Sequence, residues 1–298
     1  AFSGYHGWCD WYLAANLSNK DGLNQHLLSG LKPSGVPAGL KGTAIPFKYN
    51  DIEQLEKLIK DNHGKIAAII MEVSRNEGPK DDYLQKVREL ATENNILLIF
   101  DECTSGFRET FGGLHKKYEV EPDLAIFAKS LGNGYAISAC IGKQRFMQAA
   151  QKTFISSTFW TERIGPTAAL KTLEVMEREK SWHIITKIGE DISKKWIKLA
   201  DKYDLSINTW GLPALSGYTF NAADVLSYKT LITQEMLKKG YLSANCVYAC
   251  TAHTQEVVDG YFIALDPIFA TIKECEEGRD VNTLLDGPIC HSGFKRLN

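Results

Sequence analysis

An acidic and a basic side chain stand at the ends of two short apolar segments. Asp101 directly follows the apolar residues 96–100, and Lys129 directly follows residues 124–128. If both segments are strands of an open parallel sheet, the two side chains face the crevice outside the carboxyl ends of the strands, where such sheets bind ligands. A lysine amine can form a Schiff base with the aldehyde of pyridoxal phosphate, and a carboxylate can keep the pyridine nitrogen protonated. On spacing alone, a capping role for Asp101 and a solvated surface charge for Lys129 explain the pattern equally well.

Glycines and hydroxyls near these two residues indicate where a ligand could approach. The glycine-rich turn 132–134 follows Lys129 and would let the backbone come close to a ligand. Ser156, Ser157 and Thr158 precede a long helical pattern. Hydroxyls and free amides at the start of a helix can bind phosphate, whereas ordinary N-capping of the helix is the alternative.

The elements that must position these residues alternate between strand and helix. Helical spacing of apolar residues predicts helices over 51–61, 81–94, 143–150 and the segment after 163, and continuous apolar runs predict strands over 66–73, 96–100, 124–128 and 137–142. Strands buried on both faces and separated by helices indicate an α/β domain.

A second, smaller domain is expected where the pattern changes near residue 180. Helices are predicted over 182–203, 226–239 and 254–277, with antiparallel strands within 206–221 and 241–252. We therefore assign residues 1–180 to a large α/β domain and residues 181–298 to a small α+β domain. The first fifty residues are rich in Gly, Pro, Ser and aromatic residues and are predicted to form a long loop with short pieces of structure.

Composition limits the kinds of partner and location. The net charge is -2, with 34 Lys and Arg against 36 Asp and Glu, and no basic block favours nucleic acid. No apolar run approaches the roughly 20 residues needed to span a bilayer, and the N-terminal residues lack the pattern of a signal peptide. Seven scattered cysteines suit reduced thiols in a cytoplasmic protein. Cys246, Cys250 and His253 have the spacing of metal ligands, but their strand-like context favours buried structural thiols, so we expect no metal.

Several ordered motifs resemble one family. Residues 100–142, FDECTSGFRETFGGLHKKYEVEPDLAIFAKSLGNGYAISACIG, resemble the cofactor core of class III (subgroup II) aminotransferases, which have fold type I of the pyridoxal phosphate enzymes. The opening SGYHGWCDWY is similar to the aromatic-His-Gly motif of that family, and SSTFWTERIGPTAAL is similar to its Ser-Gly-Asn-Pro helix start. The branch that contains glutamate-1-semialdehyde aminomutase looks most similar. The resemblance covers the chain from its first residue to about Glu177.

The resemblance implies a fold, a cofactor and roles for individual residues. It implies a fold type I large domain, with a mainly parallel sheet covered by helices, and pyridoxal 5′-phosphate as the cofactor. Lys129 would form the internal aldimine and then move the proton between Cα and C4′ of the cofactor. Asp101 would pair with the pyridinium nitrogen, and Tyr5 would stack on the ring. His6 would orient the loop that carries Tyr5, and Thr104 would approach the 3′-oxygen of the ring.

The resemblance also implies a partner subunit and a substrate site. Thr158 would hydrogen-bond the phosphate of the neighbouring subunit's cofactor, which implies a homodimer. Glu77 lies where the family places a polar residue near the Schiff base or the substrate, although an ordinary surface carboxylate is equally consistent. Trp160 and Glu162 stand where the family motif is small, so they would reshape the substrate site. This change argues against the semialdehyde aminomutase reaction itself.

One departure from the family concerns the beginning of the chain. The phosphate loop of the family and part of its substrate-carboxylate site lie upstream of the aromatic-His-Gly motif, and no such segment precedes Ala1, so we expect an N-terminally truncated chain.

The expected function is transfer of an amino group from an amino donor to a keto or aldehyde acceptor by a ping-pong mechanism. The alternatives are a catalytically incompetent fragment of this fold, an aminomutase of the glutamate-1-semialdehyde type, a dinucleotide-binding oxidoreductase and a purely structural binding module. The oxidoreductase is disfavoured because the turn after Lys129 lacks a third glycine and a later acidic residue.

Overall fold

The computed structural model describes residues 2–7, 10–19, 22–23, 26, 31–74, 76–156, 158–159 and 161–292. The chain divides into two compact units. The first includes the described residues up to Glu179, and the second spans Lys180–Ser292. Each unit has its own sheet and its own buried core.

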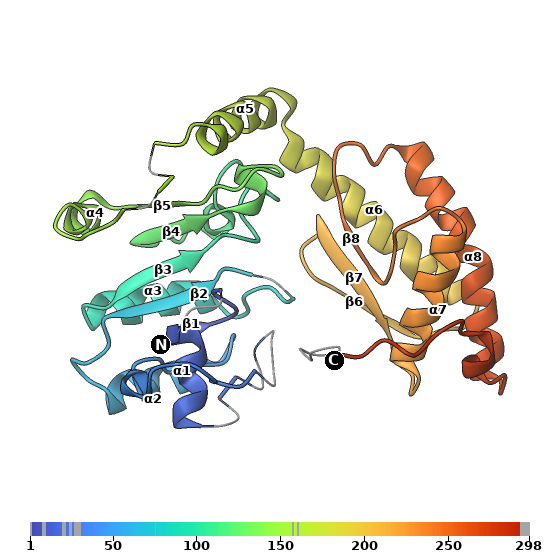
Figure 1. Ribbon diagram of the computed structural model, residues 1–298, viewed down its shortest axis with the longest axis horizontal. Coiled ribbons are helices and arrows are strands. Elements are labelled where there is room, and N and C mark those ends of the chain that lie inside the picture. Colours follow the sequence, from blue (N-terminus) through green and yellow to red (C-terminus); the bar gives the residue numbers. More distant parts are fainter. Residues whose placement is uncertain are drawn as a thin grey trace. The chain divides into compact units, whose positions relative to one another are not determined.

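The first unit is built on a five-stranded sheet with the strand order β1-β2-β3-β4-β5 (Figure 1). The strands are β1 (Phe2–Ser3), β2 (Ala68–Glu72), β3 (Leu97–Asp101), β4 (Leu124–Phe127) and β5 (Ala139–Gly142). The first four run parallel, and β5 pairs with β4 in the antiparallel direction. A mostly parallel sheet whose strands are connected through helices confirms the predicted α/β class.

The N-terminal residues form more structure than the sequence predicts. Residues Asp10–Ser18 form helix α1 in place of the expected loop. Its Tyr12 and Ala15 are buried together with Leu23, and Ile70 of β2 packs against this cluster while remaining only partly buried. The sequence does not reveal α1 because the helix is short and acquires a buried face only by packing in the tertiary structure. The partial burial of Ile70 also shows that this face of the sheet is covered less completely than predicted.

The other described helices of the first unit agree with the predicted helices. They are α2 (Ile52–Asp61), α3 (Tyr83–Glu93), α4 (Gln144–Ala150) and α5 (Ile164–Glu179). Helix α2 begins where Asp51 Oδ1 accepts a hydrogen bond of 3.0 Å from the Gln54 N–H, an ordinary N-cap. Ala169 of α5 is buried in one cluster with Ala125 and Phe127 of β4. Helix α5 therefore packs beside the strand that leads to Lys129.

Asp123 ties the amino ends of β3 and β4 to their neighbours. Its buried carboxylate accepts hydrogen bonds from the Leu98 N–H at 3.0 Å, from Arg88 Nη1 at 3.0 Å and from Lys143 Nζ at 2.8 Å. Burial alone would raise the pKa of this carboxyl, but the hydrogen bonds from Leu98, Lys143 and Arg88 outweigh burial and lower the pKa. These contacts hold β4 in register beside β3 at the sheet edge opposite Asp101.

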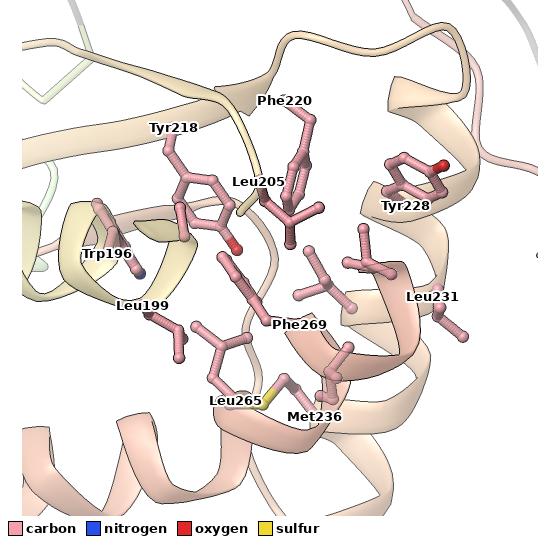
Figure 2. Close-up of a cluster of buried hydrophobic side chains, with 14 of the residues drawn as sticks. Trp196, Leu199, Leu205, Tyr218, Phe220, Tyr228, Leu231, Met236, Leu265 and Phe269 are labelled. Atoms are coloured by element: carbon pink, nitrogen blue, oxygen red, sulfur yellow. The ribbon is translucent and has the colours of Figure 1, made fainter. Parts of the chain in front are cut away.

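Within Lys180–Ser292, three helices pack with a small antiparallel sheet. The helices are α6 (Ser181–Lys202), α7 (Val225–Lys238) and α8 (Gln255–Glu276), and the strands are β6 (Ile207–Trp210), β7 (Leu215–Phe220) and β8 (Cys246–Tyr248) in that order across the sheet. Figure 2 shows the aromatic core of this unit, in which Trp196 of α6 and Tyr218 of β7 lie near Phe269 of α8. Each helix end lies one residue from its predicted position, because the long amphipathic pattern defines these helices locally.

Two cysteines of the second unit correct a prediction. Cys246 and Cys250 are exposed and free, whereas the sequence predicts buried structural thiols. The reason is that β8 is only three residues long and is not buried, so the strand-like sequence pattern of 241–252 is longer than the strand that forms.

Over the described residues, no group of three or more His, Cys, Asp or Glu side chains is arranged to hold a metal ion. The described helices also include none that combines the length and the apolar character needed to cross a bilayer.

Candidate active site

Polar residues meet at the carboxyl edge of the first sheet. Glu72 ends β2 in register with Asp101, which ends β3, and Asp101 is in register with Ile126 of β4. The short 3₁₀ turn Lys129–Leu131 follows β4. Because these strands are parallel, Asp101 and Lys129 follow neighbouring strands at the same edge of the sheet, as the sequence predicts.

The Lys129 amine donates hydrogen bonds to the loop that follows β3. Its Nζ lies 3.0 Å from Thr104 Oγ1 and 3.1 Å from Cys103 Sγ. The Lys129 backbone has a φ of 43°, in the left-handed region that costs about 1–3 kcal/mol for a residue other than glycine. Hydrogen bonds of 3.2 and 3.0 Å from the N–H groups of Gly132 and Asn133 to the Lys129 carbonyl hold the turn in this conformation. Backbone strain that is held in place by its surroundings is typical of functional residues.

The glycines after Lys129 serve the turn itself. A Cβ atom at Gly132 would lie 2.1 Å from the Tyr135 carbonyl oxygen. Gly134 has a φ of 106°, a conformation that favours glycine. The packing and backbone geometry of the turn therefore require both glycines, and the close approach of a ligand at this turn stays a prediction.

Asp101 is buried, and its carboxylate accepts hydrogen bonds at both oxygens. Oδ2 lies 2.7 Å from His6 Nδ1, and Oδ1 accepts a bond of 3.0 Å from the Cys103 N–H. The second ring nitrogen of His6, Nε2, lies 3.0 Å from the Ser3 carbonyl oxygen. His6 therefore orients the Asp101 carboxylate directly, a contact that the sequence does not predict.

Tyr5 lies on a turn that its neighbours support. Gly4 has a φ of 112°, and a Cβ there would lie 2.8 Å from Glu72 Oε2, so only glycine fits. The Tyr12 ring of α1 meets the Tyr5 ring edge-on, with centroids 5.5 Å apart. His26 Nδ1 donates a hydrogen bond of 3.1 Å to the Gly4 carbonyl oxygen, and burial lowers the pKa of His26. These contacts place Tyr5 beside the residue that binds Asp101.

The buried carboxylate of Glu102 holds the loop that presents Cys103 and Thr104 to Lys129. Glu102 Oε1 accepts a hydrogen bond of 2.9 Å from the His115 N–H and lies 2.8 Å from His115 Nδ1. Glu102 Oε2 accepts a hydrogen bond from the Ser105 hydroxyl. A loop anchored at a buried charge can hold its other residues in a defined position.

Sequence reasoning did not single out Glu72, Glu102 or Cys103 as site residues. Glu72 ends an apolar run just as Asp101 does, so the same strand-end signal could have identified it. Glu102 is adjacent to Asp101 in the recognised motif, but its role depends on contact with His115. The position of Cys103 beside Lys129 depends on the pairing of β3 with β4 and leaves no local signal.

The remaining predicted residues have different surroundings. Glu77 is exposed, and its Oε2 lies 2.8 Å from Lys80 Nζ. Thr158 is exposed in the turn ahead of α5. Glu162 accepts hydrogen bonds from the backbone N–H groups at the start of α5, including that of Gly165 at 3.2 Å, and so caps this helix. Trp160 lies outside the described residues. Roles for these four side chains in binding cofactor or substrate stay predictions.

Comparison with known proteins assigns the chain to a family. The family model "Aminotransferase class-III" matches residues 2–255. The chain belongs to this family. Among class-III relatives, it is 34% identical over 265 residues to the 3-aminobutyryl-CoA aminotransferase of Cloacimonas acidaminovorans, an alignment that covers 85% of this chain and 60% of the relative. It is 31% identical over 283 residues to the glutamate-1-semialdehyde 2,1-aminomutase of Methanosphaera stadtmanae, covering 88% of this chain and 65% of that protein. The family match confirms the predicted family. The chain spans less than two thirds of the length of these relatives.

Solved structures of pyridoxal phosphate proteins share the fold of this class-III chain. The pyridoxal phosphate internal aldimine form of the FumI protein of Sphingopyxis sp. MTA144 has a TM-score of 0.79 at 22% identity, covering 93% of this chain and 66% of that one. A transaminase with pyridoxal phosphate bound has a TM-score of 0.78 at 19% identity, covering 94% of this chain and 68% of that one. At these identities the comparison shows the fold, and it confirms the predicted pyridoxal phosphate-transferase fold.

Proposed function

We propose that this chain carries the cofactor-binding core of a pyridoxal phosphate-dependent aminotransferase. The enzyme transfers an amino group from an amino donor to a keto or aldehyde acceptor in two ping-pong half-reactions. One observation carries the proposal: a lysine amine and a buried carboxylate follow neighbouring parallel strands and are connected through the loop that contains Cys103 and Thr104. Membership of the class-III family supports the same reaction class.

The amine, hydroxyl and carboxylate at this edge of the sheet fit pyridoxal phosphate. When bound, the cofactor supplies an aldehyde that reacts with amines and a ring that accepts electrons from the substrate carbon. Lys129 Nζ would be the amine that holds the cofactor covalently, and Thr104 Oγ1, 3.0 Å away, orients this amine. Asp101, buried and oriented by His6, would keep the ring nitrogen protonated. Tyr5 supplies an aromatic face on the turn next to His6.

Lys129 is also placed to transfer protons. A primary amine with hydrogen-bond partners can accept a proton from the substrate carbon that bears the amino group, and it can return a proton in the second half-reaction. The turn that follows β4 is held by its own backbone hydrogen bonds, so Nζ can change partners while its Cα stays in place. Proximity of this kind is worth several kcal/mol of barrier in well-positioned groups.

The chain is proposed to act as a cytoplasmic homodimer in which Thr158 binds the phosphate of the neighbouring subunit's cofactor. Large apolar side chains that flank Thr158 in the sequence are exposed in the single chain, with exposed fractions of 97% for Phe154 and 76% for Phe159, and Leu170 of the following helix α5 is 71% exposed. Exposed apolar side chains that gather in one region favour contact with another protein surface. Sedimentation analysis should give a dimer, and Phe154→Ser together with Phe159→Ser should shift it toward monomer. A wild-type monomer at all concentrations would contradict the dimer.

The substrate side of the site is proposed to include Glu77, Trp160 and Glu162. Replacing Glu77 by Gln should raise KM for the acceptor without loss of cofactor if Glu77 contacts substrate. An unchanged KM would leave its ion pair with Lys80 as the role of this carboxylate. A matching test of Glu162 must separate substrate contact from helix capping, so Glu162→Asp, which keeps a capping carboxylate, is the suitable variant.

A second candidate is an intramolecular amino transfer of the aminomutase type. The 31% identity to the aminomutase of Methanosphaera stadtmanae favours it. The two candidates differ in what they need. An aminotransferase incubated with donor alone stops after releasing one keto product for each site, whereas an aminomutase converts its amino aldehyde repeatedly without an external acceptor.

Titration with pyridoxal phosphate tests the proposed function directly. We expect an absorbance band at about 420 nm from the lysine-bound cofactor. Borohydride should abolish the band and leave the label on the peptide that contains Lys129. Lys129→Ala should lack the band, whereas Lys152→Ala, which removes an exposed amine in the turn after α4, should keep it.

A negative titration has two meanings that a longer chain separates. If the band is absent here but present when the upstream segment of the Cloacimonas relative is fused to Ala1, this chain is a catalytically incompetent part of the fold. If the band is absent from both proteins, the proposed function is wrong.

A further inference from the structure

We propose that Cys103 and Lys129 form a reversible covalent sulfur–nitrogen bond when a hydroperoxide oxidises the thiol. The bond would make this pair a modification site at the edge of the first sheet. It goes beyond the proposed function because it requires only the two side chains and an oxidant. Its effect on cofactor binding, described below, rests on the proposed function.

The reacting atoms already lie at the distance from which bonds form. Cys103 Sγ is 3.1 Å from Lys129 Nζ, and well-oriented reacting atoms are typically about 3–3.5 Å apart before reaction. Two contacts hold this arrangement. The Cys103 N–H donates to Asp101 Oδ1 at 3.0 Å, and Thr104 Oγ1 accepts from Nζ at 3.0 Å. The chain therefore brings a thiol and an amine together through a buried anchor on one strand and a turn on the next.

The thiol is also accessible to an oxidant. Cys103 is free and only partly buried, so a small peroxide can reach its sulfur. Oxidation of cysteine to sulfenic acid is selective for accessible thiols, and a sulfenic acid condenses with nearby nucleophiles. Lys129 Nζ is a nucleophile in contact with this sulfur, which directs the condensation to nitrogen.

The chemistry balances in two steps. First, the sulfur of Cys103 attacks a hydroperoxide such as H₂O₂, the O–O bond breaks, the thiol is oxidised to sulfenic acid, and the peroxide is reduced to water. Second, the lone pair of the neutral Lys129 amine attacks the sulfur, the S–O bond breaks, and the hydroxyl leaves with one amine proton as water. The product is Cys–S–NH–Lys. A thiol reductant reverses it by attacking the sulfur, and the freed nitrogen takes the thiol proton.

The bond would act as a switch on the proposed cofactor site. Lys129 nitrogen in an S–N bond is no longer a primary amine and cannot condense with an aldehyde. Oxidation should therefore prevent loading of cofactor-free protein. Loaded protein should be protected, because its lysine nitrogen is already engaged.

Mass spectrometry of the cofactor-free 298-residue chain tests the bond without any reference to activity. After treatment with H₂O₂ and digestion, we expect the peptides that contain Cys103 and Lys129 to be joined, with a combined mass about 2 Da below their sum. Dithiothreitol should separate them. The joined peptides should be absent from Cys103→Ser, which keeps a hydrogen-bond acceptor near Nζ, and present in Cys140→Ser, which removes an exposed free cysteine of β5.

The outcomes separate this inference from the proposed function. Oxidation of Cys103 to sulfinic acid or to a disulfide, with Lys129 unmodified, would overturn the S–N bond even if pyridoxal phosphate binds. Joined peptides in a chain that shows no band at about 420 nm after reduction would support the bond, and the proposed function would then be decided by the fused longer chain. If the S–N bond forms and the proposed function is right, peroxide should reduce the band of the wild-type chain at least fivefold relative to untreated protein, and dithiothreitol should restore it. The band of Cys103→Ser should stay at its own untreated level.

Discussion

The contact between His6 and Asp101 should stabilise the first unit measurably. His6 Nδ1 lies 2.7 Å from Asp101 Oδ2, and the two side chains are 7% and 10% exposed, so solvent screens this contact little. Hydrogen bonds that involve a charged group contribute about 1.5–3 kcal/mol. We therefore expect a coupling free energy of about 2 kcal/mol between the two side chains, which is roughly a 30-fold change in the folding equilibrium.

A double-mutant cycle measures this coupling. The cycle compares His6→Ala, Asp101→Asn and the double variant, and the coupling is the departure of their free energies of unfolding from additivity. Because the chain has two compact units, the readout must report on the first alone. Amide hydrogen exchange of β2 and β3 provides such a readout, since these strands form the centre of the first sheet.

An exposed histidine provides the control for the cycle. His63 is exposed within the turn after α2, so His63→Ala combined with Asp101→Asn should be additive. A coupling between His6 and Asp101 below about 0.5 kcal/mol, the usual error of additivity, would refute the assignment of His6 as the residue that orients Asp101.

Three further predictions concern the framework around the site. Asp123→Asn should destabilise the first unit by about 3 kcal/mol at neutral pH, because Arg88 and Lys143 lose an anionic partner. Because the folded-state pKa of Asp123 is lowered, its ionised carboxylate contributes fully to the free energy of unfolding above the ordinary carboxyl pKa of about 3.9. This contribution is lost as the pH falls through the folded-state pKa, and urea unfolding at a series of pH values measures the loss. Burial lowers the pKa of His26, so on acidification the unfolded state binds the proton before the folded state does. The free energy of unfolding should therefore fall as the pH drops below about 6.5, and His26→Gln should remove this part of the pH dependence. Glu162→Ala should cost about 1 kcal/mol of helix stability by removing the cap of α5, measured by thermal unfolding, whereas Glu177→Ala in the last turn of the same helix should have little effect.

Each of these predictions has a result that would contradict it. For Asp123, a difference between wild type and variant that stays constant down to pH 3 would show that its ionised form contributes nothing. For His26, an identical pH profile in the Gln variant would assign the dependence to another group. For Glu162, equal effects of the two glutamate substitutions would mean that helix α5 does not depend on this cap.

Long amphipathic helices and buried strands were predictable because their signals are local. Helices α6, α7 and α8 are each more than three turns long, and one apolar face of each repeats along the sequence. Strands β3 and β4 are apolar runs that end at an ionisable residue or shortly before one, which is why Asp101 and Lys129 could be selected without a structure. Helix α1 escaped prediction because its burial comes from contacts with Leu23, Leu31 and Ile70.

The partners of the site residues were less predictable than the residues themselves. His6 and Asp101 are 95 positions apart in the chain, and Cys103 and Lys129 are 26 apart. Neither separation is a period of helix or strand, so no local pattern connects the members of either pair. Glu162 shows the same limit, since its capping of α5 becomes visible only in the fold, while its predicted substrate contact stays a prediction.

The sequence by itself determined the family, the order of strands and helices from α2 onward, and the positions at which an amine and a carboxylate leave the sheet. These features follow from hydrophobic periodicity and from motifs in which neighbouring residues act together. The tertiary structure alone decided that His6 binds Asp101, that Lys129 contacts Cys103 and that Lys129 has a left-handed backbone. Those outcomes depend on the pairing of β1, β2, β3 and β4 side by side, because hydrogen bonds between distant segments form only once the sheet has brought the strand ends together.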